Sequence, residues 1–520
     1  MSSLRAVLET TVARTPKKTF LVYKDQEVSY GDFLTAVTET ANGFLSLGLK
    51  KGDKIAILLP NGLEFPQCWL AANMIGAIMV PVNGRFVDRE IEYILGHSEA
   101  KAIVTSGQHL DIVLNIKGRL PYLNSVITVD AAATDNTIPL NRLGKKSAKP
   151  AGIAIEGTDP AVILYTSGTT GNPKGCVATQ DYFIDLATTQ GGIFQLTPED
   201  RVYTAQPFYY MDPQWNTIMV LLHNATLVIA EKFSTTGFWD EVRRNRITVF
   251  YCIGSMTSFL YNMPPSELDK QHRLRMVQTS GIAPLIHKAW EERFNVPVFE
   301  TYGSTETAID TAVYPGTDRK VGTASIGRTV PYREAKIFDD EDMEVPRGEI
   351  GEIVLKRGRG MMTGYYKDPD ATERAFRGGW FHTGDLGYVD PDGDLHFAGR
   401  KKDIIRRGGE NIAAASIEQA LITHPKILDV AAIPVPDKVR GEEVKVYVVL
   451  RPGQTITFEE VIEFSEKNMA EYKVPRYVEI RESLPKTPSE RVQKEKLKQE
   501  KKDLTEGCYD RLAEQNKKKS

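Results

Sequence analysis

The chain is poor in cysteine and has no long uninterrupted apolar run. Its cysteines are Cys68, Cys176, Cys252 and Cys508. None belongs to a CxxC pair, which excludes a zinc site or redox couple built on paired thiols. The charged N-terminal stretch lacks the apolar core of a secretory signal. The longest apolar stretch, residues 68–82, is interrupted by Asn73 and Pro81 and is too short to span a bilayer. We therefore expect a cytoplasmic protein without integral membrane association, in which this stretch forms a buried helix leading into a strand.

An excess of positive charge is also absent. Lysine and arginine number 65 against 68 aspartates and glutamates, so the formal net charge is −3. This balance gives no electrostatic basis for binding nucleic acid, which we do not expect as a partner. The 520 residues, 41% of them apolar, allow about three domains' worth of core and exclude a small stapled scaffold.

Short β-branched runs alternate with helix-like stretches in the first half of the chain. The runs lie at residues 54–59, 102–106, 125–130, 161–167, 226–230 and 247–254. Near-continuous apolar strands between helices are typical of parallel sheets covered on both faces. From about Ala335, Gly- and Asp-rich turns between strand candidates indicate an antiparallel subdomain. We therefore predict an α/β fold with a large N-terminal domain of parallel-type sheets, helices and this antiparallel subdomain.

The charged segment GRKKDIIRRGGEN, residues 399–411, separates this part from a compact α+β pattern. We predict an N-terminal domain over residues 1–399, a hinge at 400–402 and a small C-terminal domain over 403–520. Its Lys-rich tail, from about residue 493, is expected to be a solvated, partly frayed helix.

The strongest motif is YTSGTTGNPKG, residues 165–175, directly after the strand candidate AVIL. Its three glycines and four aliphatic hydroxyls, closed by Lys174, can wrap phosphate oxygens with backbone N–H groups and hydroxyls. It is not a Walker loop, because GxxxxGK[ST] is absent. The motif predicts a polyphosphate cradle.

Four further motifs follow in order: SGIAPL (280–285), FETYGSTET (299–307), GWFHTGDLG (379–387) and GRKKD (399–403). With the first loop they resemble the AMP-forming adenylating superfamily of acyl-CoA synthetases, luciferases and peptide-synthetase adenylation domains. The resemblance implies ATP and Mg²⁺ as cofactors and coenzyme A as co-substrate. The ATP or AMP contacts it implies are Thr166, Ser167, Gly168, Thr169, Thr170, Gly171, Lys174, Gly281, Ile282, Ala283, Glu300, Thr301, Tyr302, Gly303, Thr305, Asp385 and Arg400.

Individual roles also follow from the resemblance. Tyr302 would stack on adenine, and Thr305 would hydrogen-bond the α-phosphate. Glu306 would hold Mg²⁺ with help from Thr166, because oxygen ligands suit a hard cation. Asp385 would accept hydrogen bonds from the ribose, with Arg400 as its companion.

The C-terminal domain of this superfamily swings about a hinge between two half-reactions, and the hinge residue here would be Lys402. The loop RGGEN, residues 407–411, is similar to the one that swings into the site. Gly408, Gly409 and Glu410 would then contact coenzyme A. Taken alone, a Gly-Gly pair is more often a plain turn.

The last family motif departs from the pattern, because this chain has LPKTPSERV where LPKTxxGKI is usual. Arg491 stands at the position of the lysine that reaches the carboxylate and α-phosphate. The planar guanidinium is wider than an ammonium, so the exchange is not geometrically neutral. We expect Arg491 to act in its place, since the transition state needs positive charge there. Loss of activity, or a role for Lys494, are the alternatives.

The segment QPFYYMDPQWN, residues 206–216, resembles the family's acyl-binding region, with Tyr210 at a position usually held by histidine and counted among the catalytic candidates. The expected acyl pocket contains Tyr209, Tyr210, Met211, Asp212 and Trp215. Aromatic faces with one carboxylate could hold a quaternary ammonium group. A core aromatic cluster is the alternative interpretation.

We predict ATP-dependent ligation of a small carboxylic acid to coenzyme A through an acyl adenylate. The whole chain also resembles bacterial carnitine/crotonobetaine CoA ligases, which makes those acids candidates. Medium-chain, hydroxy and aryl acids remain open, as do transfer to a carrier-protein thiol, a luciferase-like oxygenase and a non-catalytic nucleotide-binding module. Both a monomer and a homodimer are compatible with the sequence.

Overall fold

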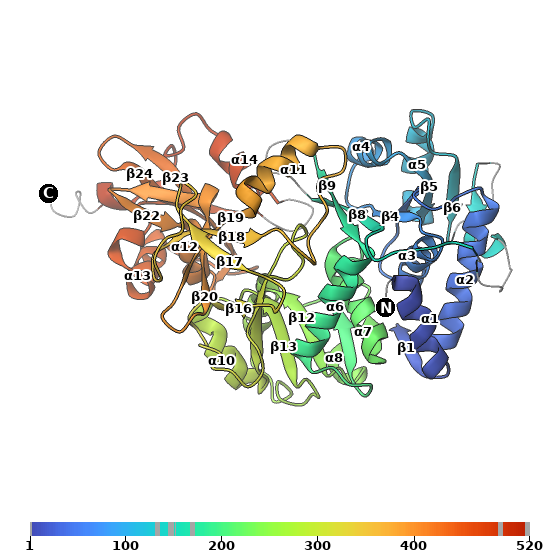
Figure 1. The fold of residues 1–520 in the computed structure, drawn as a ribbon. Coiled ribbons are helices and arrows are strands. Elements are labelled where there is room, and N and C mark those ends of the chain that lie inside the picture. The colour runs from blue at the N-terminus through green and yellow to red at the C-terminus, as the bar shows by residue number, and fades with distance from the viewer. Residues whose placement is uncertain are drawn as a thin grey trace.

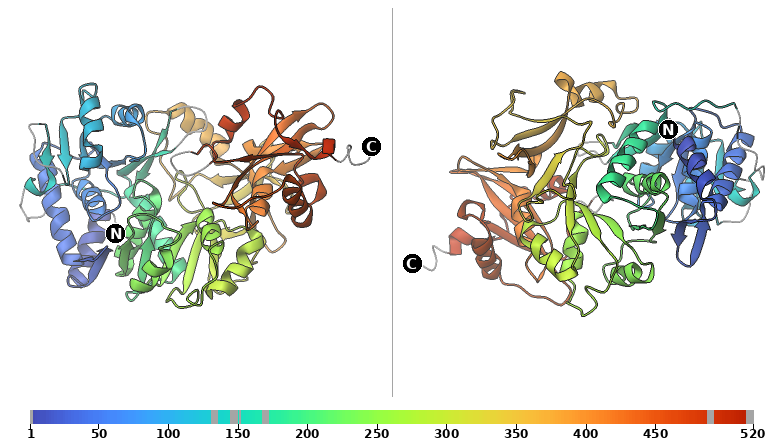
Figure 2. Two further views of the ribbon diagram at one scale, coloured as in Figure 1. Left: turned by 180° about the vertical axis from the view of Figure 1, so that it is seen from behind. Right: turned by 60° about the horizontal axis from the view of Figure 1, so that its bottom comes forward.

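The computed structural model describes residues 3–130, 136–143, 150, 152–166, 172–486 and 492–514. In this part of the chain the strands form three sheets, of 7, 13 and 6 strands. Figure 1 shows a broad N-terminal part, coloured blue to yellow, with the C-terminal segment in orange and red at one end. The other views keep the C-terminal segment beside the yellow strands and away from the N-terminal helices (Figure 2).

The first sheet is mainly parallel and has the order β7-β6-β5-β3-β4-β8-β9. Its last two strands form an antiparallel hairpin. The strands are β3 (Lys54–Leu58), β4 (Ile78–Pro81), β5 (Ala100–Thr105), β6 (Ser125–Thr128), β7 (Ile138–Pro139), β8 (Pro160–Thr166) and β9 (Lys174–Thr179). The helices of this region are α1 (Leu4–Arg14), α2 (Tyr30–Ser46), α3 (Glu64–Met74), α4 (Asp88–Ser98) and α5 (Gly107–Lys117), and a 3-10 turn covers Leu140–Arg142. The buried helix and strand expected at residues 68–82 are α3 and β4, so that prediction is confirmed.

The second sheet combines parallel and antiparallel strands in one path, β17-β18-β19-β20-β16-β15-β14-β13-β12-β10-β11-β1-β2. Its mainly parallel part contains β1 (Thr19–Tyr23), β2 (Gln26–Ser29), β10 (Arg201–Thr204), β11 (Thr226–Ile229), β12 (Val249–Ile253), β13 (Met276–Ser280) and β14 (Val298–Tyr302). The helices in this stretch are α6 (Gln180–Phe194), α7 (Met211–His223), α8 (Phe238–Arg244), α9 (Gly254–Tyr261) and α10 (Pro284–Phe294).

The antiparallel part begins at β14 and contains β15 (Thr311–Ala312), β16 (Ser325–Thr329), β17 (Ala335–Phe338), β18 (Gly351–Lys356), β19 (Trp380–Val389) and β20 (Leu395–Arg400). Helix α11 (Pro369–Ala375) and a 3-10 turn (Arg377–Gly379) lie between β18 and β19. Antiparallel strands from about Ala335 were expected, and β17 to β20 confirm them, although the antiparallel pairing already begins at β15. These strands belong to the same continuous second sheet as the parallel strands, which the local sequence patterns did not indicate.

The third sheet belongs to the C-terminal segment. Its strands are β21 (Ile404–Arg407), β22 (Glu410–Ala413), β23 (Ile427–Asp437), β24 (Gly441–Leu450), β25 (Tyr477–Arg481) and β26 (Tyr509–Asp510). Helices α12 (Ala414–Leu421), α13 (Phe458–Asn468) and α14 (Lys494–Gln499) and the 3-10 turns Lys401–Asp403 and Glu471–Lys473 complete it. Strand β20 ends at Arg400 and β21 begins at Ile404, with the expected hinge residue Lys402 between them.

The Lys-rich C-terminal stretch differs from the solvated helix that we expected. Helix α14 is short, and its Leu497 is fully buried. Strand β26 pairs with β25, and Arg511 is 8% exposed. Lysine density misled the sequence prediction because a few apolar and paired residues between the lysines attach this stretch to the third sheet.

No helix in the described ranges is both long and apolar enough to cross a membrane.

A buried ion pair holds the loop that follows β14. Arg333 Nε lies 2.8 Å from Asp310 Oδ1, and both side chains are inaccessible to solvent. Thr307 donates a hydrogen bond to Asp310 Oδ2 at 2.5 Å, and Arg333 donates one to the Thr307 carbonyl at 2.8 Å. Burial raises the pKa of Asp310 to about 6, and the guanidinium opposes that rise. The loop is therefore tied to the antiparallel strands by groups that cannot be solvated.

We expect Arg333→Met to destabilise the fold by about 3–5 kcal/mol, because Asp310 would remain buried without its cation. The double variant Arg333→Met with Asp310→Leu should recover much of this loss, since it removes both charges. Urea unfolding of both variants tests the expectation. Equal stabilities of the single and double variants would contradict it.

Candidate active site

The predicted phosphate loop is the connection between β8 and β9. Thr166, the last residue of β8, and Lys174, the first of β9, are cross-strand partners, and the Thr166 hydroxyl contacts the Lys174 carbonyl at 3.5 Å. The predicted contacts Ser167, Gly168, Thr169, Thr170 and Gly171 lie outside the described residues. Thr166 and Lys174 are described, and they mark the residues where the loop leaves β8 and enters β9.

A short segment from the antiparallel part extends the first sheet at β9. The N–H of Val177 donates to the Gly364 carbonyl at 3.0 Å, and the N–H of Tyr366 donates to the Gly175 carbonyl at 2.7 Å. Cys176 and Tyr365 form an antiparallel bridge between these hydrogen bonds. This pairing joins segments about 190 residues apart and places Tyr365 beside the end of the phosphate loop.

Tyr365 connects two predicted site residues. Its hydroxyl donates a hydrogen bond to Glu306 Oε1 at 3.2 Å. The Lys174 ammonium lies over its ring, 5.0 Å from the centroid. The structure thus brings Lys174 and Glu306 to one aromatic side chain, which sequence reasoning missed. The only local signal was a glycine followed by two tyrosines at residues 364–366.

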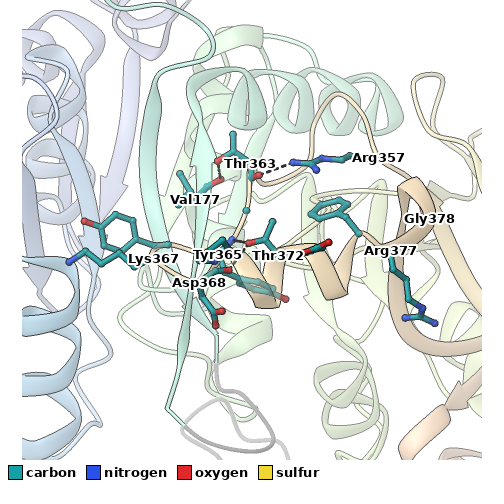
Figure 3. A pocket seen from close by; sticks show the side chains of 14 residues that line it. Val177, Arg357, Thr363, Tyr365, Lys367, Asp368, Thr372, Arg377 and Gly378 are labelled. Carbon is teal, nitrogen blue, oxygen red and sulfur yellow. Dashed lines mark hydrogen bonds between the residues drawn. The ribbon is translucent and has the colours of Figure 1, made fainter.

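Tyr365 also lines a surface groove of about 830 Å³ beside α11. Figure 3 shows Tyr365 near Thr372 and Asp368, with Arg357 approaching Thr363. Arg357 donates to the Thr363 carbonyl at 3.2 Å, and its guanidinium lies 4.5 Å from the centre of the Phe376 ring. These contacts hold the wall of the groove next to the β9 pairing.

The loop of the FETYGSTET motif is anchored on both sides of Glu306. The N–H of Met362 donates to the Glu306 carbonyl at 2.8 Å, and the Tyr182 hydroxyl donates to the Thr305 carbonyl at 2.9 Å. Burial, strengthened by the nearby Glu306 carboxylate, raises the pKa of Cys176 well above its usual value. The Cys176 thiol is therefore neutral and is no candidate for a nucleophile.

Tyr302, at the end of β14, lies beside Asp385 of β19 and Arg400 of β20 in the second sheet. The Tyr302 hydroxyl donates to Asp385 Oδ2 at 2.9 Å, while Arg400 Nε lies 3.3 Å from Asp385 Oδ1. Asp385 and Arg400 are cross-strand partners in β19 and β20. Burial raises the pKa of Tyr302, so its hydroxyl keeps the proton that it donates.

Two predicted nucleotide contacts have side chains engaged in the fold. The Thr301 hydroxyl donates to the Thr311 carbonyl at 2.9 Å. Glu300 is 5% exposed, and burial raises its pKa to about 8, although the N–H of Ile282 bonds it. Neither side chain is therefore open to the role expected from the sequence, and the Glu300 carbonyl accepts a hydrogen bond from the Val313 N–H at 2.9 Å.

Glycine is required at two of the predicted positions. Gly281 has φ +87°, which L side chains rarely adopt, and it directly follows β13. A Cβ at Gly303 would collide with the Ala308 carbonyl oxygen. Ala283 caps the N-terminus of α10, so the turn 281–283 leads from strand end to helix.

The predicted acyl residues form the start of α7. Tyr209 and Tyr210 have ring centroids 4.6 Å apart, and Tyr210 is the N-cap residue. Trp215 Nε1 donates to Asp212 Oδ1 at 3.3 Å. The Tyr182 hydroxyl also contacts Met211 Sδ at 3.7 Å, so one side chain connects this segment to the Thr305 carbonyl. Tyr182 is a second residue that sequence reasoning missed.

The predicted C-terminal residues occupy the third sheet and its entrance. Gly408 and Gly409, with φ of +59° and +91°, form the turn between β21 and β22, and Glu410 begins β22. Arg491 lies outside the described ranges. The alternative cation, Lys494, bonds Glu418 Oε1 at 2.8 Å and lies 3.7 Å from Asp403. Lys494 is therefore engaged within the C-terminal segment.

Comparison with known proteins now identifies the family. The model of the AMP-binding enzyme family matches residues 8–366, and that of its C-terminal domain matches residues 416–491. The chain belongs to the AMP-binding enzyme family.

Curated relatives within this family cover nearly the whole chain. The chain is 38% identical over 484 residues to crotonobetaine/carnitine–CoA ligases from Escherichia coli O9:H4 (strain HS) and Shigella sonnei (strain Ss046). The aligned part is 90% of this chain and 93% of each relative.

Solved structures of family members share the fold. The anthranilate CoA ligase AuaEII with anthranoyl-AMP has a TM-score of 0.88 and 25% identity, covering 96% of this chain and 97% of that one. ATP-bound MatB from Rhodopseudomonas palustris has a TM-score of 0.85 and 27% identity, covering 97% and 100%. ATP is thus bound by a protein of this fold, and the predicted α/β architecture is confirmed.

Tyr365→Phe should raise the Mg²⁺ concentration needed for half-maximal pyrophosphate release and lower the maximal rate about tenfold. The variant removes the hydrogen bond to Glu306 but keeps the ring beneath Lys174. The matched control is Tyr366→Phe, since the ring of Tyr366 packs on His97. An unchanged Mg²⁺ requirement in Tyr365→Phe, or an equal change in the control, would contradict the expectation.

Proposed function

We propose that the acid joined to coenzyme A by this chain carries a quaternary ammonium group, with carnitine and crotonobetaine as the candidates. The chain is an AMP-forming acid–CoA ligase. The observation that carries the choice of acid is the 38% identity, over 90% of the chain, to ligases named for these two acids. Asp212, beside the aromatic residues Tyr209, Tyr210 and Trp215, supplies a carboxylate and π faces suited to such a cation.

The first half-reaction forms an acyl adenylate. A carboxylate oxygen of the acid attacks the α-phosphorus of ATP, and the bond to pyrophosphate breaks. The second half-reaction displaces AMP with the thiol of coenzyme A. Neither step needs a covalent protein nucleophile, because positioning and charge stabilisation supply most of the catalysis.

Lys174, Glu306 and Arg491 are proposed to surround the reacting phosphates. Lys174 is exposed at the end of the loop, and Glu306 shares Tyr365 with it. Arg491 would provide the cation near the acid carboxylate and α-phosphate, while Thr305 would hydrogen-bond the α-phosphate. Tyr210 is proposed to border the reacting carboxylate from the start of α7.

Glu306 fits a Mg²⁺ ion held mostly by nucleotide. The described residues contain no group of three or more His, Cys, Asp or Glu that could hold a metal ion. Mg²⁺ commonly uses one or two carboxylates together with substrate phosphates and water, which a lone Glu306, helped by Thr166, can match. When bound, the ion would neutralise phosphate charge.

Tyr302, Asp385 and Arg400 are proposed to hold the nucleoside. The hydrogen bond from Tyr302 orients the Asp385 carboxylate, a kind of acceptor that suits ribose hydroxyls. The turn at Gly281, Ile282 and Ala283 would border the adenine, where the absence of a side chain at Gly281 permits close approach.

Coenzyme A is proposed to enter along the Gly408–Gly409 turn. Both residues are glycines, so the turn has no side chains and a narrow thiol arm could pass beside it. We further propose that residues 1–399 and 403–520 act as two domains about Lys402, which brings this turn to the reacting adenylate.

Incubation with ATP, Mg²⁺, coenzyme A and a panel of acids tests the proposed function. The panel contains carnitine, crotonobetaine, medium-chain, hydroxy and aryl acids, with AMP and thioester followed by mass spectrometry. We expect the trimethylammonium acids to give the highest kcat/KM. A higher value for an uncharged acid would refute the choice of acid, and AMP formation without any thioester would indicate a carrier-protein acceptor.

Arg491→Ala should lower the rate of acyl adenylate formation by at least about a hundredfold, because a positioned charge at a transition state contributes on this scale. Thiolation of supplied adenylate should change far less. Arg491→Lys should restore part of the first rate. Equal losses in both half-reactions would show that Arg491 does not replace the family lysine.

A further inference from the structure

One fully buried amide in the second sheet has no hydrogen-bond partner among the described residues. Gln278 lies in β13 with 0% exposure, and neither its Oε1 nor its Nε2 is bonded. Most buried polar side chains in native proteins have at least one partner, and leaving one unsatisfied costs stability. An amide that keeps both a donor and an acceptor unused therefore requires an explanation.

The neighbours of Gln278 on its own sheet face are largely aromatic. In the parallel register, Gln278 pairs with Tyr251 of β12 and Phe299 of β14, so the three side chains share one face. Tyr251 and Phe299 belong to the same hydrophobic core as Trp215 of α7. Apolar residues of similar size could fill this position without leaving polar atoms unpaired.

This face continues directly into the proposed acyl region. Trp215 packs against Tyr251 with ring centroids 5.1 Å apart, and its indole N–H bonds Asp212. The Tyr251 hydroxyl lies 2.8 Å from the hydroxyl of Ser280, two residues beyond Gln278 and on the same face. Gln278 thus lies on this face beside Tyr251, one side chain further from the strand end than Ser280.

We propose that the Gln278 amide hydrogen-bonds a hydroxyl group on the acid and so makes this enzyme selective for hydroxylated substrates. A hydroxyl is both a donor and an acceptor, so it can bond either the oxygen or the nitrogen of the amide. A second hydroxyl or a water molecule could bond the other atom. The inference rests on the proposed function and deepens it: Asp212 and the aromatic residues would select the ammonium group. Of the two candidate acids, Gln278 would favour carnitine, because crotonobetaine has no hydroxyl.

A polar site of this kind discriminates strongly against analogues that lack the hydroxyl, because the amide is then left unpaired. For the wild type we expect kcat/KM for carnitine to exceed that for 4-(trimethylammonio)butanoate by at least about tenfold. The two acids differ only in the hydroxyl. The same preference, at lower overall rates, should hold between 3-hydroxybutanoate and butanoate.

Gln278→Met, which keeps the side-chain length and removes both polar atoms, is the test variant. It should lower kcat/KM for the hydroxylated member of each pair about tenfold, mainly through KM, and leave the other member within about twofold. The matched control is Thr204→Val, because the Thr204 hydroxyl is equally buried, also lacks a partner among the described residues, and lies in β10 on the far side of β12. Thermal unfolding confirms that each variant is folded. If Gln278→Met does not fold, Gln278→Asn, which shortens the same amide, replaces it with the same expectation.

The four acids separate the two hypotheses. Preference for uncharged over trimethylammonium acids would refute the proposed substrate class while the hydroxyl comparison still tests Gln278. An absent hydroxyl preference in the wild type, an equal loss for both members of a pair in Gln278→Met, or the same change in Thr204→Val would overturn the role of Gln278.

Discussion

The pairing of residues 363–366 with β9 is the interaction on which the candidate site depends. It joins the edge of the first sheet to a segment that connects β18 and β19 of the second. Without it, Lys174 and Glu306 would belong to separate sheets, connected near the site by the hydrogen bond from Tyr182 to the Thr305 carbonyl. The pairing positions Tyr365, whose ring lies beneath the Lys174 ammonium and whose hydroxyl bonds the Glu306 carboxylate.

The surrounding buried polar groups also fix the position of Glu306. Arg333 and Asp310 tie the loop after β14 to the antiparallel strands, and Tyr182 holds the Thr305 carbonyl from α6. A buried ion pair contributes little net stability relative to an apolar pair. Its value here lies in geometry, since Glu306 stands between these two anchors and can occupy only a narrow range of positions.

The fold class and the positions of most strands could be predicted from local patterns, because buried parallel strands carry continuous β-branched runs. Most of the expected site residues could be named because several motifs in order resemble those of a known family, while the glycine and hydroxyl pattern before Lys174 indicated phosphate binding by its own chemistry. Tyr365, Tyr182 and Gln278 could not, since each acquires its role only through strand pairing or packing between distant segments. Thr301 shows the converse: it lies inside a strong motif, yet its hydroxyl bonds the Thr311 carbonyl.

Two interpretations of the aromatic segment after residue 206 were open from the sequence, an acyl pocket or a core cluster. Trp215 shows why they need not exclude each other. It is 1% exposed and packs against Tyr251 as a core residue, yet its indole N–H holds the Asp212 carboxylate at the start of α7. A carboxylate held in this way loses little freedom when a cation approaches, so preorganisation rather than additional contact area would supply the affinity. A rigid core face therefore suits recognition of a small, charged acid better than a flexible loop would.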